Sequence, residues 1–396
     1  MRLRQVIEQE IRERGPIPFS RYMELCLYHP ELGYYSRNAE QFGKAGDFYT
    51  ASDVQAVFGR LLARQFEEIW RVLGAPAQIE ILELGPGRGL FAQDVLDWAE
   101  KKFPPFFGAL HYSLCEQSPA LRGTLRQTLA RFLESGKVGL VPGQGGTGTT
   151  PVVTDGTVSE RALAAHVPII VFANEFFDAL PVEIISPRGT IRIAAQDNRL
   201  IESCVPPSAE ELKILDCYSV RPGPGERIEI PLLAWRYMSR LAASVHRGFV
   251  IAIDYGYTRG EQFAGRHRGT LMAYRQHSAS ANPYEAPGEQ DLTAHVNFTL
   301  LAAAAEQNSM RTQPLVTQSQ FLMGIGETNQ FADVFADCRL PQERAKVALQ
   351  LKHLVTPAGM GESFHVLVAA KAVEAERVSG LSGLSFARSR LREAHE

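Results

Sequence analysis

The chain of 396 residues is 45% hydrophobic and 21% charged, with a formal net charge of −3 at pH 7, which is typical of a globular protein. This balance offers no general basic surface for nucleic acid, and no apolar run reaches the roughly 20 residues of a membrane-spanning helix. The five cysteines lie far apart without C-x-x-C spacing, and the histidines are scattered. We therefore expect no metal site and a reducing compartment.

The first 75 residues are expected to form a helical segment and a ligand-covering loop. Apolar side chains recur at helical spacing before Pro16, and a second short helix begins near Ser20. Residues 29–50 combine glycines with aromatic side chains, so this loop either covers a flat ligand or packs onto its own core. A strong amphipathic helix follows over about 52–73.

The N-terminal stretch also bears on cellular location. Residues 1–15 lack the apolar core of a secretory signal peptide. They contain Glu8, Glu10 and Glu13, whereas mitochondrial presequences are poor in acidic residues. We therefore expect a genuine first helix in a cytoplasmic protein.

Residues 76–375 alternate between short apolar strands and amphipathic helices. Helices are expected over 90–101 and 118–135, on either side of the second strand. This alternation predicts an α/β fold with a mostly parallel sheet covered by helices on both faces. The expected strands are residues 79–84, 111–116, 151–156, 168–173, 248–254 and 363–373.

Insertions and a tail complete the expected organisation. Residues 182–231 are an insertion with a candidate hairpin, and residues 258–295 are expected to form long loops over the sheet. A helix over 292–307 has Thr293 as its candidate cap. Residues 376–396 form a C-terminal tail that we expect to be loose at its start.

The loop after the first strand reads G-P-G-R-G, and its spacing limits the ligands that it can hold. Gly85, Gly87 and Gly89 permit close approach of the backbone to a ligand. Leu90 stands where a dinucleotide-binding fold needs its third glycine, and no Gly-Lys-Ser/Thr follows as in a phosphate-binding loop. A pyrophosphate ligand is therefore disfavoured.

Two glutamates point to a different ligand. Glu83 precedes the glycine loop, and Glu116 ends the second strand, where a carboxylate can accept hydrogen bonds from both hydroxyls of a ribose. Ligands of open α/β sheets bind at the carboxyl ends of the strands, which is where both residues fall. The two carboxylates suit a ligand with an amine, a ribose and a sulfonium, as in S-adenosylmethionine. The alternative is a generic glycine turn.

The fourth strand ends in NEFFDALPVE, which places polar groups beside an apolar wall. Asn174 and Glu175 fall where the chain leaves the sheet, and Asp178 follows two phenylalanines. Attack on a sulfonium methyl needs an oriented lone pair and a dry site, so these three residues are candidates for the acceptor side. The alternative is that Asn174 and Asp178 cap a turn and the phenylalanines belong to the core.

Several blocks between residues 29 and 298 resemble one protein family. The chain is similar to the MidA family of S-adenosylmethionine-dependent methyltransferases, which is linked to assembly of respiratory complex I. The combination of NEFFDALPV with GDFYT is the specific part of the resemblance. The matching blocks are HPELGYYS, GDFYTASDVQAVFG, ILELGPGRGLFAQDVL, CEQSPALR, ANEFFDALPV, DYGY, GTLMAY and DLTAHVNF.

This resemblance implies a seven-stranded class I methyltransferase sheet, Rossmann-like, with an N-terminal helical segment and insertions. It implies S-adenosyl-L-methionine as cofactor and an arginine of a protein, such as a complex I core subunit, as acceptor; a homodimer is an open alternative. The residues that the resemblance assigns are Glu83, Gly85, Gly87, Glu116 and Asp47 for the donor, and Asn174, Glu175 and Asp178 for the acceptor side.

One residue departs from the family pattern. The family usually reads HVDF where this chain has His295 followed by Val296, Asn297 and Phe298. Asn297 replaces a carboxylate with a neutral amide. If that acid orients the acceptor, this protein should be slower or use another target.

Three functional hypotheses follow. In the first, the chain methylates a protein arginine, and Glu175 and Glu183 hold the guanidinium as in the two-glutamate loop of known arginine methyltransferases, although the DALP between them differs. Glu183 could equally be a solvated surface carboxylate. In the second, the chain is a donor-binding assembly factor or chaperone with little or no turnover. In the third, it is a nicotinamide oxidoreductase, against which Leu90 and the NEFFDALP exit argue.

Overall fold

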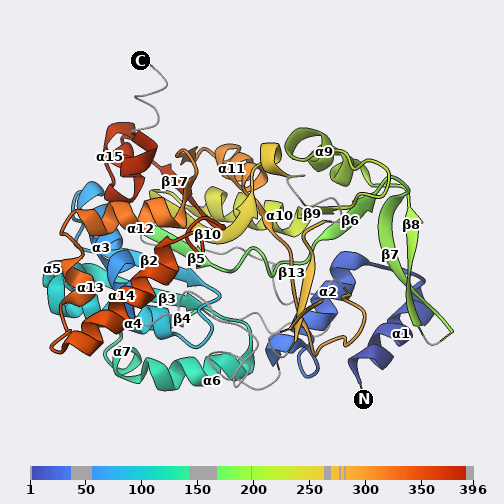
Figure 1. Ribbon diagram of the computed structural model, residues 1–396, viewed down its shortest axis with the longest axis horizontal. Coiled ribbons are helices and arrows are strands. Elements are labelled where there is room, and N and C mark those ends of the chain that lie inside the picture. The colour runs from blue at the N-terminus through green and yellow to red at the C-terminus, as the bar shows by residue number, and fades with distance from the viewer. Residues whose placement is uncertain are drawn as a thin grey trace.

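The structure is a computed structural model that describes residues 2–36, 56–141, 167–197, 199–262, 269–275, 278–280 and 282–388. Figure 1 shows a large sheet flanked by helices, and beside it a smaller sheet near the N-terminal helices. Within the described residues, every helix is too short or too polar to cross a lipid bilayer.

The large sheet confirms the predicted α/β fold. Seven neighbouring strands of the described chain run in the order β15-β17-β10-β5-β2-β3-β4, and the short strands β14 and β16 pair with β10 and β17. Neighbours from β10 to β4 are parallel, whereas β17 is antiparallel to β10. The strands are β2 (Ile79–Leu84), β3 (Leu110–Cys115), β4 (Val138–Leu140), β5 (Ile169–Asn174), β10 (Gly248–Tyr257), β14 (Val296–Asn297), β15 (Arg311–Thr312), β16 (Val316–Thr317) and β17 (Phe364–Lys371).

Helices cover both faces of this sheet because its central strands are apolar on both sides. Ile81 and Phe172 face one core cluster, and Leu82 and Val171 face the other. The first cluster is covered by α3 (Ala56–Val72), α4 (Leu90–Lys102), α5 (Pro104–Ala109), α6 (Pro119–Thr128), α7 (Ala130–Glu134), α12 (Gln318–Glu327), α13 (Ala332–Phe335), α14 (Pro341–Val355) and α15 (Ala375–Ser379). The second cluster is covered by α9 (Ala209–Tyr218), α10 (Leu232–Ser244) and α11 (Phe298–Glu306).

The predicted insertion forms a second sheet, which packs against the N-terminal helices in a third core cluster. The long loops expected after β10 contain a three-stranded sheet instead, because strands of three or four residues leave too short a pattern to detect. The elements of these parts are α1 (Leu3–Arg14), β1 (Ile17–Pro18), α2 (Phe19–Tyr28), η1 (Tyr34–Ser36), β6 (Glu183–Ser186), β7 (Gly189–Gln196), β8 (Arg199–Val205), β9 (Ile228–Ile230), η4 (Arg259–Glu261), β11 (Met272–Arg275), β12 (Ser278–Ser280) and β13 (Asp291–Thr293).

Three boundaries differ from the sequence-based expectations. The third strand predicted at 151–156 lies outside the described residues, and β4 is the strand that pairs with β3. The helix predicted over 292–307 begins at Phe298, because Asn297 caps it and Thr293 belongs to β13. The expectation of a loose start to the tail was wrong.

The start of the tail is bound to α3. The backbone N–H of Ser382, in η5 (Ser382–Leu384), donates to Glu68 Oε1 at 3.0 Å, and that of Gly383 donates to Gln65 Oε1 at 3.0 Å. The predicted division at residue 75 stays a prediction. In the described contacts, α3 packs on the large sheet while α1 and α2 pack on the second one.

Candidate functional site

The glycine loop links β2 to α4 at the carboxyl end of the central strands. Gly85, Gly87 and Gly89 have φ of 62°, 55° and 78°, a region that favours glycine. A Cβ at Gly87 would meet nothing within 4 Å, whereas one at Gly89 would come within 2.5 Å of Leu125 Cδ2. Gly87 therefore borders open space, while Gly89 allows close packing of α6.

Glu83 is a buried carboxylate one residue before the end of β2. Its side chain is 5% exposed, and the hydroxyl of Tyr112 donates to Oε2 at 2.8 Å. Burial raises the pKa of Glu83 to about 8 against this hydrogen bond, and nearby Glu116 adds to the increase. A desolvated carboxylate of this kind gains most from a bound cation.

Glu116 follows β3 and faces the glycine loop. Its Oε1 accepts hydrogen bonds from the backbone N–H groups of Gln117 and Ser118, both at 2.8 Å, and its Oε2 accepts one from Gly87 at 3.3 Å. Burial raises its pKa to about 7, although these three N–H donors oppose the increase. The contact with Gly87 brings the two predicted donor elements together across the ends of β2 and β3.

The turn after β5 is organised by a residue from another strand. Oδ2 of Asp254, on β10, accepts hydrogen bonds from the backbone N–H groups of Phe176, Phe177 and Asp178 at 3.2, 3.1 and 3.3 Å. Its Oδ1 accepts one from its neighbour Tyr255 at 3.0 Å. Burial raises the pKa of Asp254 well above its usual range, and nearby acidic side chains add to the increase. Sequence reasoning missed this role because the two segments are far apart in the chain.

The three predicted acceptor-side residues lie together in and before this turn. Glu175 has φ of 49°, a costly conformation for a residue with a side chain, and its Oε1 accepts a hydrogen bond from Asn174 Nδ2 at 3.1 Å. The hydroxyl of Tyr255 donates to Asp178 Oδ2 at 2.5 Å. Burial raises the pKa of Asp178 to about 6. Asp178 is 5% exposed, and no described residue donates a hydrogen bond to its Oδ1 or to Asn174 Oδ1.

This turn lies next to the glycine loop. A Cβ at Gly85 would come within 3.1 Å of Phe176 Cδ2. The pairing of β2 with β5 explains the contact, since Leu84 stands opposite Ala173 and both strands end at the same edge of the sheet. The predicted donor and acceptor elements are therefore adjacent.

Other residues singled out from the sequence have structural roles or lie elsewhere. Glu183 is on β6 and accepts hydrogen bonds from Ser20 Oγ at 2.5 Å and Arg192 Nη1 at 3.0 Å, so it is neither a surface carboxylate nor part of the turn after β5. The ring of His295 packs edge-on against Tyr255, with 5.1 Å between ring centres. Asp47 lies outside the described residues.

Asn297 is buried and caps α11. Its Oδ1 accepts a hydrogen bond from Leu300 N at 3.0 Å, and its Nδ2 donates to Tyr218 O at 3.0 Å. An aspartate could make the first bond but not the second. The amide at position 297 therefore has a structural role in capping α11, and its presence does not remove a carboxylate from the turn after β5.

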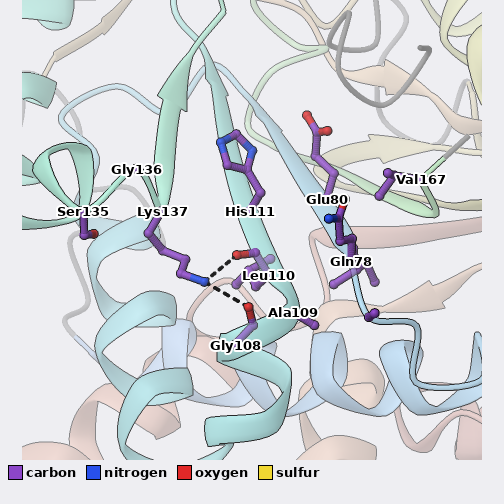
Figure 2. Close-up of a pocket in the computed structure, with 12 residues that line it drawn as sticks. Gln78, Glu80, Gly108, Ala109, Leu110, His111, Ser135, Gly136, Lys137 and Val167 are labelled. Carbon is purple, nitrogen blue, oxygen red and sulfur yellow. Dashed lines mark hydrogen bonds between the residues drawn. The ribbon is translucent and has the colours of Figure 1, made fainter. Parts of the chain in front are cut away.

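A cavity of about 240 Å³ lies at the opposite, amino ends of β2 and β3 (Figure 2). Its lysine, Lys137, donates to the carbonyl oxygens of Phe107, Gly108 and Leu110 at 2.7, 3.3 and 2.9 Å. The ammonium thus holds the end of α5 and is not directed at a ligand. Within the described residues, no group of three His, Cys, Asp or Glu side chains could hold a metal ion.

A family model described as S-adenosyl-L-methionine-dependent methyltransferase matches residues 61–316. The chain belongs to this family. Its cofactor is therefore S-adenosyl-L-methionine, and the prediction of a methyltransferase is confirmed. The nicotinamide hypothesis is set aside for the same reason.

Curated relatives of this methyltransferase cover nearly the whole chain. The Drosophila melanogaster protein arginine methyltransferase NDUFAF7 homolog, named mitochondrial, is 30% identical over 383 residues, which is 91% of this chain and 83% of that protein. The human protein arginine methyltransferase NDUFAF7, also named mitochondrial, is 27% identical over 388 residues, covering 90% and 80%. A Burkholderia thailandensis crystal structure with bound S-adenosylhomocysteine is 27% identical, with a TM-score of 0.78 and coverage of 97% and 94%.

These names contradict the cytoplasmic location expected from the N-terminus, and that prediction was wrong. The physical reason lies in α1. The buried face of α1 packs against the second sheet, so its amphipathic pattern is explained by folding. The glutamates of this helix therefore do not indicate the cellular compartment.

Proposed function

We propose that this methyltransferase acts on arginine side chains of a protein partner, as the names of its curated relatives state for those proteins. The observation that carries the proposal is the acidic turn after β5. There Asp178 is buried, its Oδ1 accepts no hydrogen bond from the described residues, and Glu175 and Asn174 lie beside it, next to the glycine loop. A buried carboxylate without a basic partner suits a cationic acceptor.

For the donor, we propose contacts from Glu83, Gly85, Gly87, Glu116 and Asp47. The described residues of this set fit S-adenosyl-L-methionine. Open space borders Gly87, Glu116 ends β3 at the position expected for a ribose, and desolvated Glu83 would gain from an ammonium group. When bound, this cofactor supplies an electrophilic methyl group on a sulfonium, and the electron pair of the broken C–S bond stays on sulfur.

The acceptor side must orient one guanidinium nitrogen and remove one proton. A guanidinium has a pKa above about 12, so its nitrogen is a poor nucleophile until carboxylates localise the charge on the other nitrogens. We assign this orientation to Glu175 and Asp178, with Asn174 fixing the side chain of Glu175. As the new N–C bond forms, the displaced N–H proton passes to a carboxylate of the turn and then to water. Because the pKa of Asp178 is raised to about 6, its carboxylate is a better proton acceptor than an ordinary aspartate.

The partner is also part of the proposal. We extend it to a core subunit of respiratory complex I as target, and to a homodimer as the working assembly. The alternative is a donor-binding assembly factor without turnover, and Asn297 does not favour it, because its side chain caps α11. Light scattering of the purified protein tests the homodimer separately.

The proposal is tested by methyl transfer from labelled S-adenosyl-L-methionine to complex I subunits, with the modified residue identified by mass spectrometry. Dimethylarginine is the expected product. Glu175→Gln and Asp178→Asn should each lower the rate by about tenfold or more, as expected for orienting groups, while S-adenosylhomocysteine still binds. Glu289→Gln is the control, because Glu289 is a half-exposed partner of Arg275. Methyl groups on other residue types, or full activity of both variants, would refute the proposal.

A further inference from the structure

Strand β13 brings another buried carboxylate to the turn after β5. Asp291 is 5% exposed, and the backbone N–H of Ala294 donates to Asp178 O at 3.0 Å, so β13 ends alongside the turn. Leu292 packs into the cluster around α2. Because side chains alternate along a strand, Asp291 and Thr293 face the opposite side.

That side is the one that contains Asp178. Tyr255 donates to Asp178 Oδ2, and a side-chain hydrogen bond with Thr293 lowers the pKa of Tyr255 against the increase from burial and neighbouring carboxylates. Tyr274 stands opposite Asp291 on β11. Burial raises the pKa of Tyr274, and both Asp291 and Asp178 add to the increase. The two aspartates thus act on the same phenol, from two different segments.

Tyr35 links this acidic group to the donor end of the sheet. Its hydroxyl donates to Asp291 Oδ1 at 3.0 Å, and its carbonyl oxygen accepts a hydrogen bond from Ser118 Oγ at 2.7 Å. The backbone N–H of Ser118 in turn donates to Glu116 Oε1 at 2.8 Å. The ring of Tyr35 also packs against that of Tyr28, with 5.5 Å between the ring centres.

We propose that Asp178 and Asp291 together form the clamp for the acceptor guanidinium, and that Tyr35 is a positioning residue that ties this clamp to Glu116. The inference rests on the proposed arginine activity and adds a residue from a separate strand to its site. A guanidinium presents five N–H donors in a planar fork, which two carboxylates on different segments can engage at once. A lysine ammonium is a compact charge without this fork, so the clamp favours arginine.

The test separates acceptor binding from turnover. Nα-acetyl-arginine methylamide, which carries one cation, is titrated into protein saturated with S-adenosylhomocysteine. We expect saturable binding, with the matching lysine compound at least about tenfold weaker. Asp291→Asn should weaken arginine binding by about tenfold or more, and Glu289→Gln, two residues away and exposed, should leave it unchanged. Affinity for S-adenosylhomocysteine should be the same in all variants, which shows that they are folded.

Tyr35→Phe gives a readout that a structural role alone would not produce. It should weaken arginine binding several-fold in the wild-type background and have no further effect when combined with Asp291→Asn, because it acts through that carboxylate. The clamp is overturned if Asp291→Asn binds arginine normally, if lysine binds equally well, or if the wild type does not bind the arginine compound. Arginine binding without methyl transfer would refute the proposed function and leave the clamp standing. Methyl transfer that is unaffected by Asp291→Asn would refute the clamp and leave the proposed function standing.

Discussion

Substitution of Asp254 should disturb the turn after β5 more than the rest of the fold. In the native protein, this side chain accepts four backbone hydrogen bonds, three of them from residues 176–178. A backbone hydrogen bond contributes about 1 kcal/mol net, and a buried N–H left without a partner costs about 1–3 kcal/mol. Asp254→Ala removes both acceptor oxygens and with them all four bonds, so it should destabilise the protein by about 4 kcal/mol or more.

Asp254→Asn is the milder change. Its amide oxygen can turn toward the three N–H groups of the turn, which leaves the N–H of Tyr255 facing an NH2 group. The expected loss is about 1–2 kcal/mol. At roughly 2–4 °C per kcal/mol for a large domain, the melting temperature should fall by about 4 °C for asparagine and about 10 °C for alanine.

The assay combines thermal unfolding, S-adenosylhomocysteine titration and methyl transfer. Both variants should lose methyl transfer but keep their affinity for the donor. Glu83 and Glu116 are held in place by β2 and β3, and not by the turn after β5. Asp216→Asn is the control, since Asp216 forms an exposed ion pair with Arg221. An alanine variant that melts within about 2 °C of the wild type and transfers methyl normally would refute the reasoning.

Three further outcomes are expected. Burial raises the pKa of Glu83 to about 8 and that of Glu116 to about 7. The folded, ligand-free protein therefore favours the protonated carboxyls. Their contribution to the free energy of unfolding is fully present below the ordinary pKa of 4.5 and is lost as the pH rises through 7 to 8. Donor affinity should rise over the same window, by at most about tenfold per pH unit for each proton released, and calorimetry that shows a flat affinity would contradict this. Gly89→Ala should lower the melting temperature more than Gly87→Ala, because only the Gly89 substitution adds a clash. Gly87→Ala should instead weaken the binding of S-adenosylhomocysteine more. Equal effects of the two substitutions on both measurements would count against the proposed donor contact of Gly87. Asn297→Asp should cost about 1–3 kcal/mol, because the buried side chain loses its bond to the carbonyl of Tyr218, and the acceptor KM should stay the same. A changed KM would show that position 297 takes part in acceptor binding.

Local patterns were sufficient for the central strands and for the place of Glu83 and Glu116 near strand ends. β2, β5 and β10 are apolar runs bounded by loops, and the position of Glu116 directly after β3 agrees with the strand expected over 111–116. β4 was not predicted, since three residues including a glycine carry no periodicity.

The proposed acceptor side depends on pairings between distant segments, which a single sequence does not display. Glu183 had the right spacing from Glu175 but belongs to a strand whose partners are Ser20 and Arg192. Asp254 and Asp291 begin the DYGY and DLTAHVNF blocks, but their roles were not predicted, because these roles arise from β10 and β13 meeting the turn after β5.

The hydrogen bonds of Asp254 to main-chain atoms have a consequence for how this protein can change. The shape of residues 176–178 is set by a carboxylate 76 to 78 positions further along the chain, and that carboxylate contacts backbone N–H groups, which every residue except proline possesses. Side chains within the turn can therefore be exchanged while its path is retained. Under the proposed function, such a division lets acceptor preference change by substitution inside the turn, and it offers protein engineers a place to alter substrate choice without rebuilding the scaffold.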